Sequence, residues 1–129
     1  MGKIRRDYKN IHSSSPISSR GIKIGNMLFI SGTTANDSRA EDEGPMQQLR
    51  VVLDRITKMV LSEGGNPSDI VRLTTFVTKI DDWFPLEGEI VEVFNEFFGD
   101  QKPTNAIMEV SRLAKPSLVV EIEATVIFD

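Results

Sequence analysis

Apolar residues recur at helical spacing between residues 45 and 63. They fall at positions i, i+3, i+4, i+7 and i+11, which places them on one stripe of a helix: Leu49, Val52, Leu53, Ile56 and Val60. Gly64 and Gly65 follow this segment, and glycine readily adopts the left-handed conformation that ends a helix. The pattern therefore predicts an amphipathic helix with one buried face.

A second apolar stripe predicts another helix further along the chain. We expect this helix to begin near Asp81 or Asp82, either of which can cap it, with Pro85 in its first turn and Gly99 at its end. The apolar residues of its buried face are Trp83, Leu86, Ile90, Phe94 and Phe97.

Shorter apolar segments predict strands. Residues 22–24 and 27–30 flank Gly25-Asn26, a pair that favours the tight turn of a β-hairpin. A run rich in β-branched residues predicts a strand over residues 70–77. Further strands are expected over residues 3–8, 105–110 and 118–128, and polar loops over residues 12–19 and 31–43.

The order of these elements predicts a fold. A hairpin, a helix, a strand, a helix and two strands make an α+β sandwich, in which two helices cover one face of a sheet of five or six strands. The 129 residues suit a single domain, residues 1–129. Strands 27–30 and 70–77 carry apolar residues on both alternating faces. An uncovered apolar sheet face is unusual in a monomer, so we expect the chain to associate with copies of itself through that face.

Composition excludes several kinds of function. The chain has no cysteine, which rules out disulfides and thiolate metal sites, and its one histidine, His12, cannot form a multi-histidine metal site or a two-histidine ribonuclease centre within one subunit. A net charge of −4 argues against broad nucleic-acid binding. The apolar runs are too short to span a membrane, and a cytoplasmic protein is expected.

Two carboxylates lie inside the apolar strand predicted near the C-terminus. Side chains alternate along a strand, so Glu121 and Glu123 point away from the face that carries Val120, Ile122, Ala124 and Val126. A partly buried carboxylate has a raised pKa and can act as a general base or position a water molecule. The alternative is a structural ion pair with an interface arginine. We favour the ion pair for Glu123 and keep both interpretations for Glu121.

Four ordered segments of the chain resemble the Rid family, also called YjgF/YER057c/UK114. They are residues 24–32, Gly64-Gly65 with residues 69–77, residues 94–99, and residues 103–124. Rid proteins are small trimers whose best-known members hydrolyse reactive enamines and imines. The resemblance extends from about Ser18 to Phe128. It implies the chorismate-mutase-like (YjgF-type) sandwich, a homotrimer with small-molecule pockets between subunits, and no metal or organic cofactor.

The resemblance also implies site residues. In deaminating members a glutamate positions water, and backbone groups near a Ser-Gly turn and the penultimate strand complete the pocket. By position these correspond to Glu121, to Ser31-Gly32 and to Ile107. A tyrosine found before the first hairpin in many members is replaced here, by Ser18 or by Ile17 depending on the position of a one-residue gap.

One departure from the family pattern affects the expected activity. The arginine that binds the substrate carboxylate in deaminating members is replaced by Asn105, and Arg20 in the loop near the pocket is a candidate to substitute for it. If the chain is an enzyme, the resemblance implies a cofactor-independent, deaminase-like hydrolase of imines, enamines or related small metabolites, with altered or no activity on 2-imino acids. The alternatives are a non-catalytic ligand-binding or chaperone-like trimer and, disfavoured by the charge and the single histidine, a ribonuclease or translation inhibitor.

Overall fold

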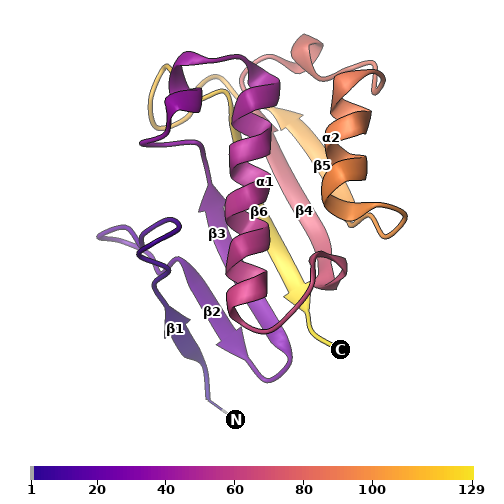
Figure 1. Cartoon of the computed structure of the whole chain (residues 1–129). Helices are drawn as coiled ribbons and strands as arrows, with labels where there is room; N and C mark the ends of the chain where they lie inside the picture. Colours follow the sequence, from indigo (N-terminus) through magenta and orange to yellow (C-terminus); the bar gives the residue numbers. More distant parts are fainter. Residues whose placement is uncertain (1) are drawn as a thin grey trace.

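The computed structural model describes residues 2–129, which form a six-stranded sheet with two helices on one face (Figure 1). The strands, in their order across the sheet, are β1 (Ile4–Arg6), β2 (Gly21–Ile24), β3 (Met27–Thr33), β6 (Val120–Ile127), β4 (Ile70–Val77) and β5 (Thr104–Glu109). Neighbouring strands are antiparallel except β4 and β5, which are parallel. The helices are α1 (Pro45–Ser62) and α2 (Glu89–Phe98). The predicted α+β sandwich is confirmed.

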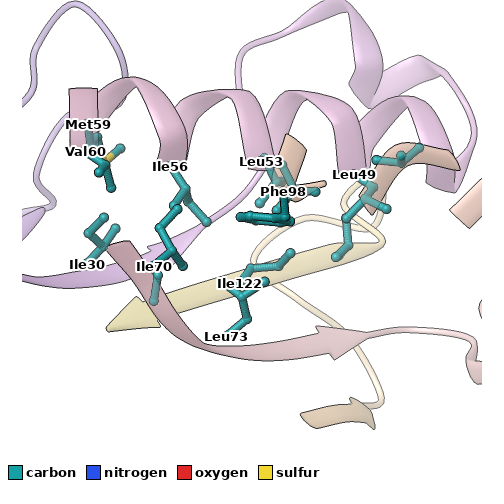
Figure 2. Packing of buried hydrophobic residues seen from close by; sticks show 14 of the residues in the cluster. Ile30, Leu49, Leu53, Ile56, Met59, Val60, Ile70, Leu73, Phe98 and Ile122 are labelled. Atoms are coloured by element: carbon teal, nitrogen blue, oxygen red, sulfur yellow. The ribbon is translucent and has the colours of Figure 1, made fainter. Parts of the chain in front are cut away.

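The core lies between the helices and the sheet. All five residues of the stripe predicted for α1 are fully buried. In Figure 2 the α1 side chains of Leu49, Leu53 and Ile56 point toward strand residues that include Ile70 and Ile122. Burying a side chain of this size stabilises the fold by about 1.5–3 kcal/mol. Gly64, with a φ of 84°, ends the helix as predicted.

The predicted start of the second helix is wrong. A short 3-10 turn covers Ile80–Asp82, and α2 begins only at Glu89. Pro85 disfavours the helical conformation at the residue before it, and Gly88 has a φ of 71°, so neither position continues a helix. As a result Leu86 is 53% exposed, and the buried α2 residues are Ile90, Val93 and Phe98. Trp83 is buried as expected, but from the segment that precedes α2.

Some predicted strand and loop boundaries are also wrong. The segment 31–43 is not a continuous loop, because β3 extends to Thr33 and a 3-10 turn covers Arg39–Asp42. The first and last strands are shorter than predicted, and a second 3-10 turn at Pro67–Asp69 precedes β4. The extension of β3 includes a β-bulge: Ile30 pairs with Ala124 and Thr33 with Ile122, so the register shifts between them.

The sheet face opposite the helices is uncovered in a single chain and carries exposed apolar side chains beside polar ones such as Glu123 and Thr74. Strand alternation buries Val120, Ile122, Ala124 and Val126 beneath the helices, as predicted. On the other face Phe29, Met108 and Ile127 are 44%, 43% and 40% exposed. Neither helix of residues 2–129 combines the length and apolarity that a membrane span requires.

Candidate functional site

Glu121 lies on the uncovered sheet face, where β6 runs between β3 and β4. It pairs with Phe76 on β4, and its carboxylate lies directly over Gly32 of the β3 bulge. A Cβ atom built on Gly32 would be only 2.2 Å from Oε2 of Glu121. The close approach of this carboxylate to the bulge therefore requires glycine at position 32.

Glu121 has an unusual environment for a carboxylate. Its side chain is half-buried, and it accepts no hydrogen bond from any residue between 2 and 129. Burial raises the pKa of Glu121, the charge of Arg20 lowers it, and that of Glu123 raises it further, with a net upward shift. A carboxylate with free lone pairs and a raised pKa can take a proton from a bound water molecule.

Arg20 lies behind the bulge and holds its backbone. Its side chain is 5% exposed, and Nη1 donates to the carbonyl oxygens of Ser31 and Gly32 at 3.2 and 2.7 Å. Nε donates to the carbonyl oxygen of Ser13 at 3.2 Å. Arg20 thus fixes the position of the backbone over which Glu121 lies. Its suggested role as a substitute for the missing arginine stays a prediction.

The predicted Ser-Gly turn and the preceding loop meet at one cavity. It has a volume of about 760 Å³, opens on the uncovered face, and is lined by Ser18, Ser31, Phe29 and Glu123 among others. The hydroxyl of Ser31 donates to the carbonyl oxygen of Ser19 at 2.7 Å. Ser18 lies at the exposed rim, where its hydroxyl is 2.8 Å from that of Ser15. Glu121 does not line this cavity; its carboxylate lies over Gly32, the residue after Ser31.

Asn105 and Ile107 lie on the other side of the sheet from Glu121. They pair with Leu73 and Thr75 on β4, so their side chains point to the helix-covered side at the β5 edge of the sheet. The side-chain oxygen of Asn105 accepts a hydrogen bond of 2.9 Å from Thr75. Both residues line a separate, mostly apolar cavity of about 230 Å³ beneath α2. Within one chain, Asn105 and Glu121 are therefore on opposite faces of the sheet.

Sequence reasoning missed the strand neighbours of these residues. Thr75 fixes the orientation of the Asn105 amide, and Phe76 lies beside Glu121. Alternation along β4 places Thr75 and Phe76 on different faces, but only the pairing of β4 with both β5 and β6 identifies their partners. Among residues 2–129, no group of three or more His, Asp or Glu side chains is arranged to hold a metal ion.

Comparison with known proteins relates this geometry to a family. Residues 9–128 match the family described as endoribonuclease L-PSP. The RutC family protein PH0854 of Pyrococcus horikoshii is 34% identical over 109 residues, 82% of each chain. TdcF of Escherichia coli K12, a provisionally named reactive intermediate deaminase, is 31% identical over 110 residues, 81% of each chain.

A solved structure agrees with these matches. Rv2704 of Mycobacterium tuberculosis, described as a member of the YjgF/YER057c/UK114 family, is 29% identical, with a TM-score of 0.79 over 98% of this chain and 99% of that one. The chain therefore belongs to the endoribonuclease L-PSP family, also known as the YjgF/YER057c/UK114 or Rid family.

Proposed function

We propose that this protein hydrolyses small imines or enamines in a pocket formed between two copies of the chain, with Glu121 positioning the attacking water. The observation that carries the proposal is the environment of Glu121, a half-buried carboxylate with a raised pKa and no hydrogen-bond donor within residues 2–129. The relative named as a reactive intermediate deaminase supports the class of reaction.

The proposed reaction needs only water. Glu121 accepts a proton from the water as its oxygen attacks the imine carbon, which gives a tetrahedral carbinolamine. The nitrogen takes up the proton, the C–N bond breaks, and ammonia and a carbonyl compound are released. Each imine thus consumes one water molecule, and Glu121 returns to its starting ionisation state. General acid–base catalysis of this kind contributes about 10²–10⁴-fold in rate.

A shared pocket follows from where the side chains point. Asn105 and Ile107 are at the β5 edge on the helix side, whereas Glu121 is on the uncovered face. One chain therefore cannot place all three around a small substrate. Association through the apolar face would bury Phe29, Met108 and Ile127, and would bring the β5 edge of one copy toward the Glu121 of another. We infer a trimer from the family's assembly.

Asn105 sets the proposed substrate preference. A bidentate arginine–carboxylate contact contributes about 1.5–3 kcal/mol, and Asn105 supplies no charge to replace it. Binding of 2-imino acids should therefore be about ten- to a hundredfold weaker than with arginine at this position. Arg20 is poorly placed to compensate, because Nε and Nη1 are occupied by backbone carbonyls. Imines without a carboxylate escape this loss.

Ammonia release tests the proposal. Imines and enamines are generated in the assay, some from amino acids by a dehydratase or an oxidase and some without a carboxylate, and the wild-type protein is compared with Glu121→Gln. We expect the variant to lose about a hundredfold or more in rate. Glu123→Gln is the matched control, because it removes a carboxylate two residues away on the same face. Equal rates for wild type and Glu121→Gln on every substrate would contradict the proposal.

A second candidate function is ligand binding without turnover. The hydrogen bond between Asn105 and Thr75 favours it, since it engages one end of the amide that stands in the place of the substrate-binding arginine. This alternative predicts saturable binding of small 2-keto acids, measured by calorimetry, with no ammonia release from any imine. Binding that survives Glu121→Gln would support it.

A further inference from the structure

A second cavity, distinct from the one beside Ser31, lies between the N-terminal loop and α1. It has a volume of about 460 Å³, and its lining includes Lys9, His12, Arg20, Asn36, Asp37 and Arg55. Neither Glu121 nor Glu123 lines it. The two cavities share Ser14 and Ser15 of the N-terminal loop, and the proposed reaction does not use the charged side chains of this second cavity.

Positive charge is concentrated in this cavity. Lys9, Arg20 and Arg55 outnumber the one acidic residue, Asp37, and neither arginine forms an ion pair within the part of the chain that the structure describes. Burial lowers the pKa of both guanidinium groups, more than the charge of Glu121 raises that of Arg20 and the charge of Asp37 raises that of Arg55. Desolvated cations that form no ion pair are stabilised when an anion binds between them.

Hydrogen-bond donors remain free on both arginines. Arg20 donates from Nε and Nη1, and Arg55 donates from Nη1 to the carbonyl oxygen of Thr34 at 2.6 Å. Nη2 of Arg20, and Nε and Nη2 of Arg55, have no partner among residues 2–129. Guanidinium groups bind phosphate oxygens through paired donors such as Nε and Nη2 of Arg55, and Arg20 can add the single donor Nη2.

The same cavity also contains two buried acceptors without partners. They are Nε2 of His12 and Oδ1 of Asn36, the two buried side-chain polar atoms found without a hydrogen bond in the described chain. Nδ1 of His12 lies 3.3 Å from the carbonyl oxygen of Ser13, so Nδ1 carries the proton and Nε2 presents a lone pair. Nδ2 of Asn36 donates to Asp37, which leaves Oδ1 as an acceptor. Buried acceptors of this kind call for a ligand that donates a hydrogen bond.

We propose that this cavity, the His12–Arg55 cavity, binds a small phosphate or phosphate monoester that carries a proton. Its charged oxygens accept from the free donors of Arg20 and Arg55, and its hydroxyl donates to Nε2 of His12. Phosphate fits both halves of the site: inorganic phosphate keeps at least one hydroxyl in both of its ionisation states near neutral pH, and a monoester, with a second pKa of about 6, keeps one on a minor part of the population. This inference goes beyond the proposed imine hydrolysis and does not depend on it.

The ionisation of His12 is coupled to the ligand. The charged groups that line the cavity with it are Lys9, Arg20, Arg55 and Asp37, and Glu121 lies beyond Arg20. Burial and the charges of Arg20 and Arg55 lower the pKa of His12. The proposed hydrogen bond at Nε2 uses the lone pair of the neutral ring, so phosphate binds with His12 unprotonated.

Magnetic resonance of the only histidine tests the site directly. Inorganic phosphate is titrated into the full chain at pH 7 and constant ionic strength, and the ring signals of His12 are followed. We expect a saturable change in the signals of the neutral ring, and binding of sulfate about tenfold weaker, because sulfate carries no proton to donate. A linear, non-saturating response to phosphate would overturn the proposal, as would equal affinity for sulfate.

Matched variants locate the binding. Arg55→Gln should weaken phosphate binding about tenfold by removing a charge-assisted contact. Lys58→Gln, on the exposed side of the same helix, should leave it unchanged. If Arg55→Gln does not fold, Lys9→Gln in the exposed loop provides the same test, with a loss of phosphate affinity severalfold smaller than that expected for Arg55→Gln. Phosphate affinity unaffected by both cavity variants would contradict the assignment.

Discussion

At the scale of single residues, the geometry of Glu121 depends on Gly32. Ala at position 32 would place its Cβ on the carboxylate of Glu121, so either the side chain or the bulge must move. We predict that Gly32→Ala lowers the free energy of unfolding by about 1–3 kcal/mol. It should also reduce ammonia release at least tenfold if the carboxylate is displaced. Chemical denaturation and the ammonia assay measure the two effects.

The matched glycine for this test is Gly44, which precedes α1. Its added Cβ would meet only the flexible end of Gln47 at 3.1 Å, and its φ of −75° suits alanine. Gly44→Ala should therefore change stability much less than Gly32→Ala and leave ammonia release intact. Equal effects of the two substitutions would show that the approach of Glu121 to Gly32 is not tight in solution.

The raised pKa of Glu121 predicts a pH-dependent stability. Burial raises this pKa above the ordinary value of 4.5, so the folded protein binds more protons than the unfolded chain in the interval between the two values. Stability from this group is therefore lost as the pH rises through that interval. Glu121→Gln removes the effect, so the stability of the variant relative to wild type should increase as the pH rises above 4.5.

Urea unfolding at fixed protein concentration measures this dependence. Glu92→Gln, an exposed position on α2, controls for the general loss of a carboxylate. A stability difference for Glu121→Gln that does not vary with pH would mean that the carboxylate is hydrated in the assembled protein.

At the scale of elements, the edge strand β1 is attached to the end of α1 by one carboxylate. Glu63 accepts from Nε of Arg6 at 2.8 Å and from the hydroxyl of Tyr8 at 2.5 Å, and its side chain is 9% exposed. We predict that Glu63→Gln lowers the free energy of unfolding by about 1–3 kcal/mol, because the partly buried donors lose a charged acceptor. Hydrogen exchange should quicken most in β1.

An exposed ion pair on α1 provides the comparison. Lys58 and Asp54 are 59% and 49% exposed, and Lys58→Gln should change stability by less than about 0.5 kcal/mol. If β1 exchanges no faster in Glu63→Gln than in Lys58→Gln, then the contact of Glu63 with Arg6 and Tyr8 does not hold the strand.

The elements also show which features can be predicted from the sequence. The stripe of α1 and the two faces of β6 were predicted correctly, because each depends only on the local period of apolar residues. The start of α2 was predicted wrongly, because Pro85 and Gly88 end the helix although the helical spacing of apolar residues continues back to Trp83. The bulge at Ser31-Gly32 depends on the register of β3 against β6, which is a contact between segments about 90 residues apart.

The site was predictable to a similar extent. Alternation alone placed Glu121 opposite the helix face, and the family resemblance supplied the Ser31-Gly32 turn. The backbone contacts of Arg20 and the unpaired acceptors around His12 require the packing of loops, which leaves no periodic signal in the sequence.

At the scale of the whole molecule, the uncovered sheet face predicts association. Phe29, 44% exposed, lies on that face, whereas Leu61, 54% exposed, is an apolar residue on α1. We predict that Phe29→Lys shifts the protein from an oligomer to a monomer, because a lysine there would be buried without a partner, and that Leu61→Lys does not. Sedimentation at micromolar concentration distinguishes these outcomes. A wild-type monomer under these conditions would contradict the expected assembly.

Subunit mixing tests the central claim, that one pocket draws on two copies of the chain. Glu121→Gln and Asn105→Trp, a variant that fills the β5 side of the pocket, should each be inactive alone. After unfolding and joint refolding at equal amounts, about a quarter of the pockets in a cyclic assembly receive an intact Glu121 from one copy and an intact β5 edge from another. We therefore predict ammonia release at about a quarter of the wild-type rate. Mixed assemblies that form, as mass spectrometry would show, yet remain inactive would contradict the account.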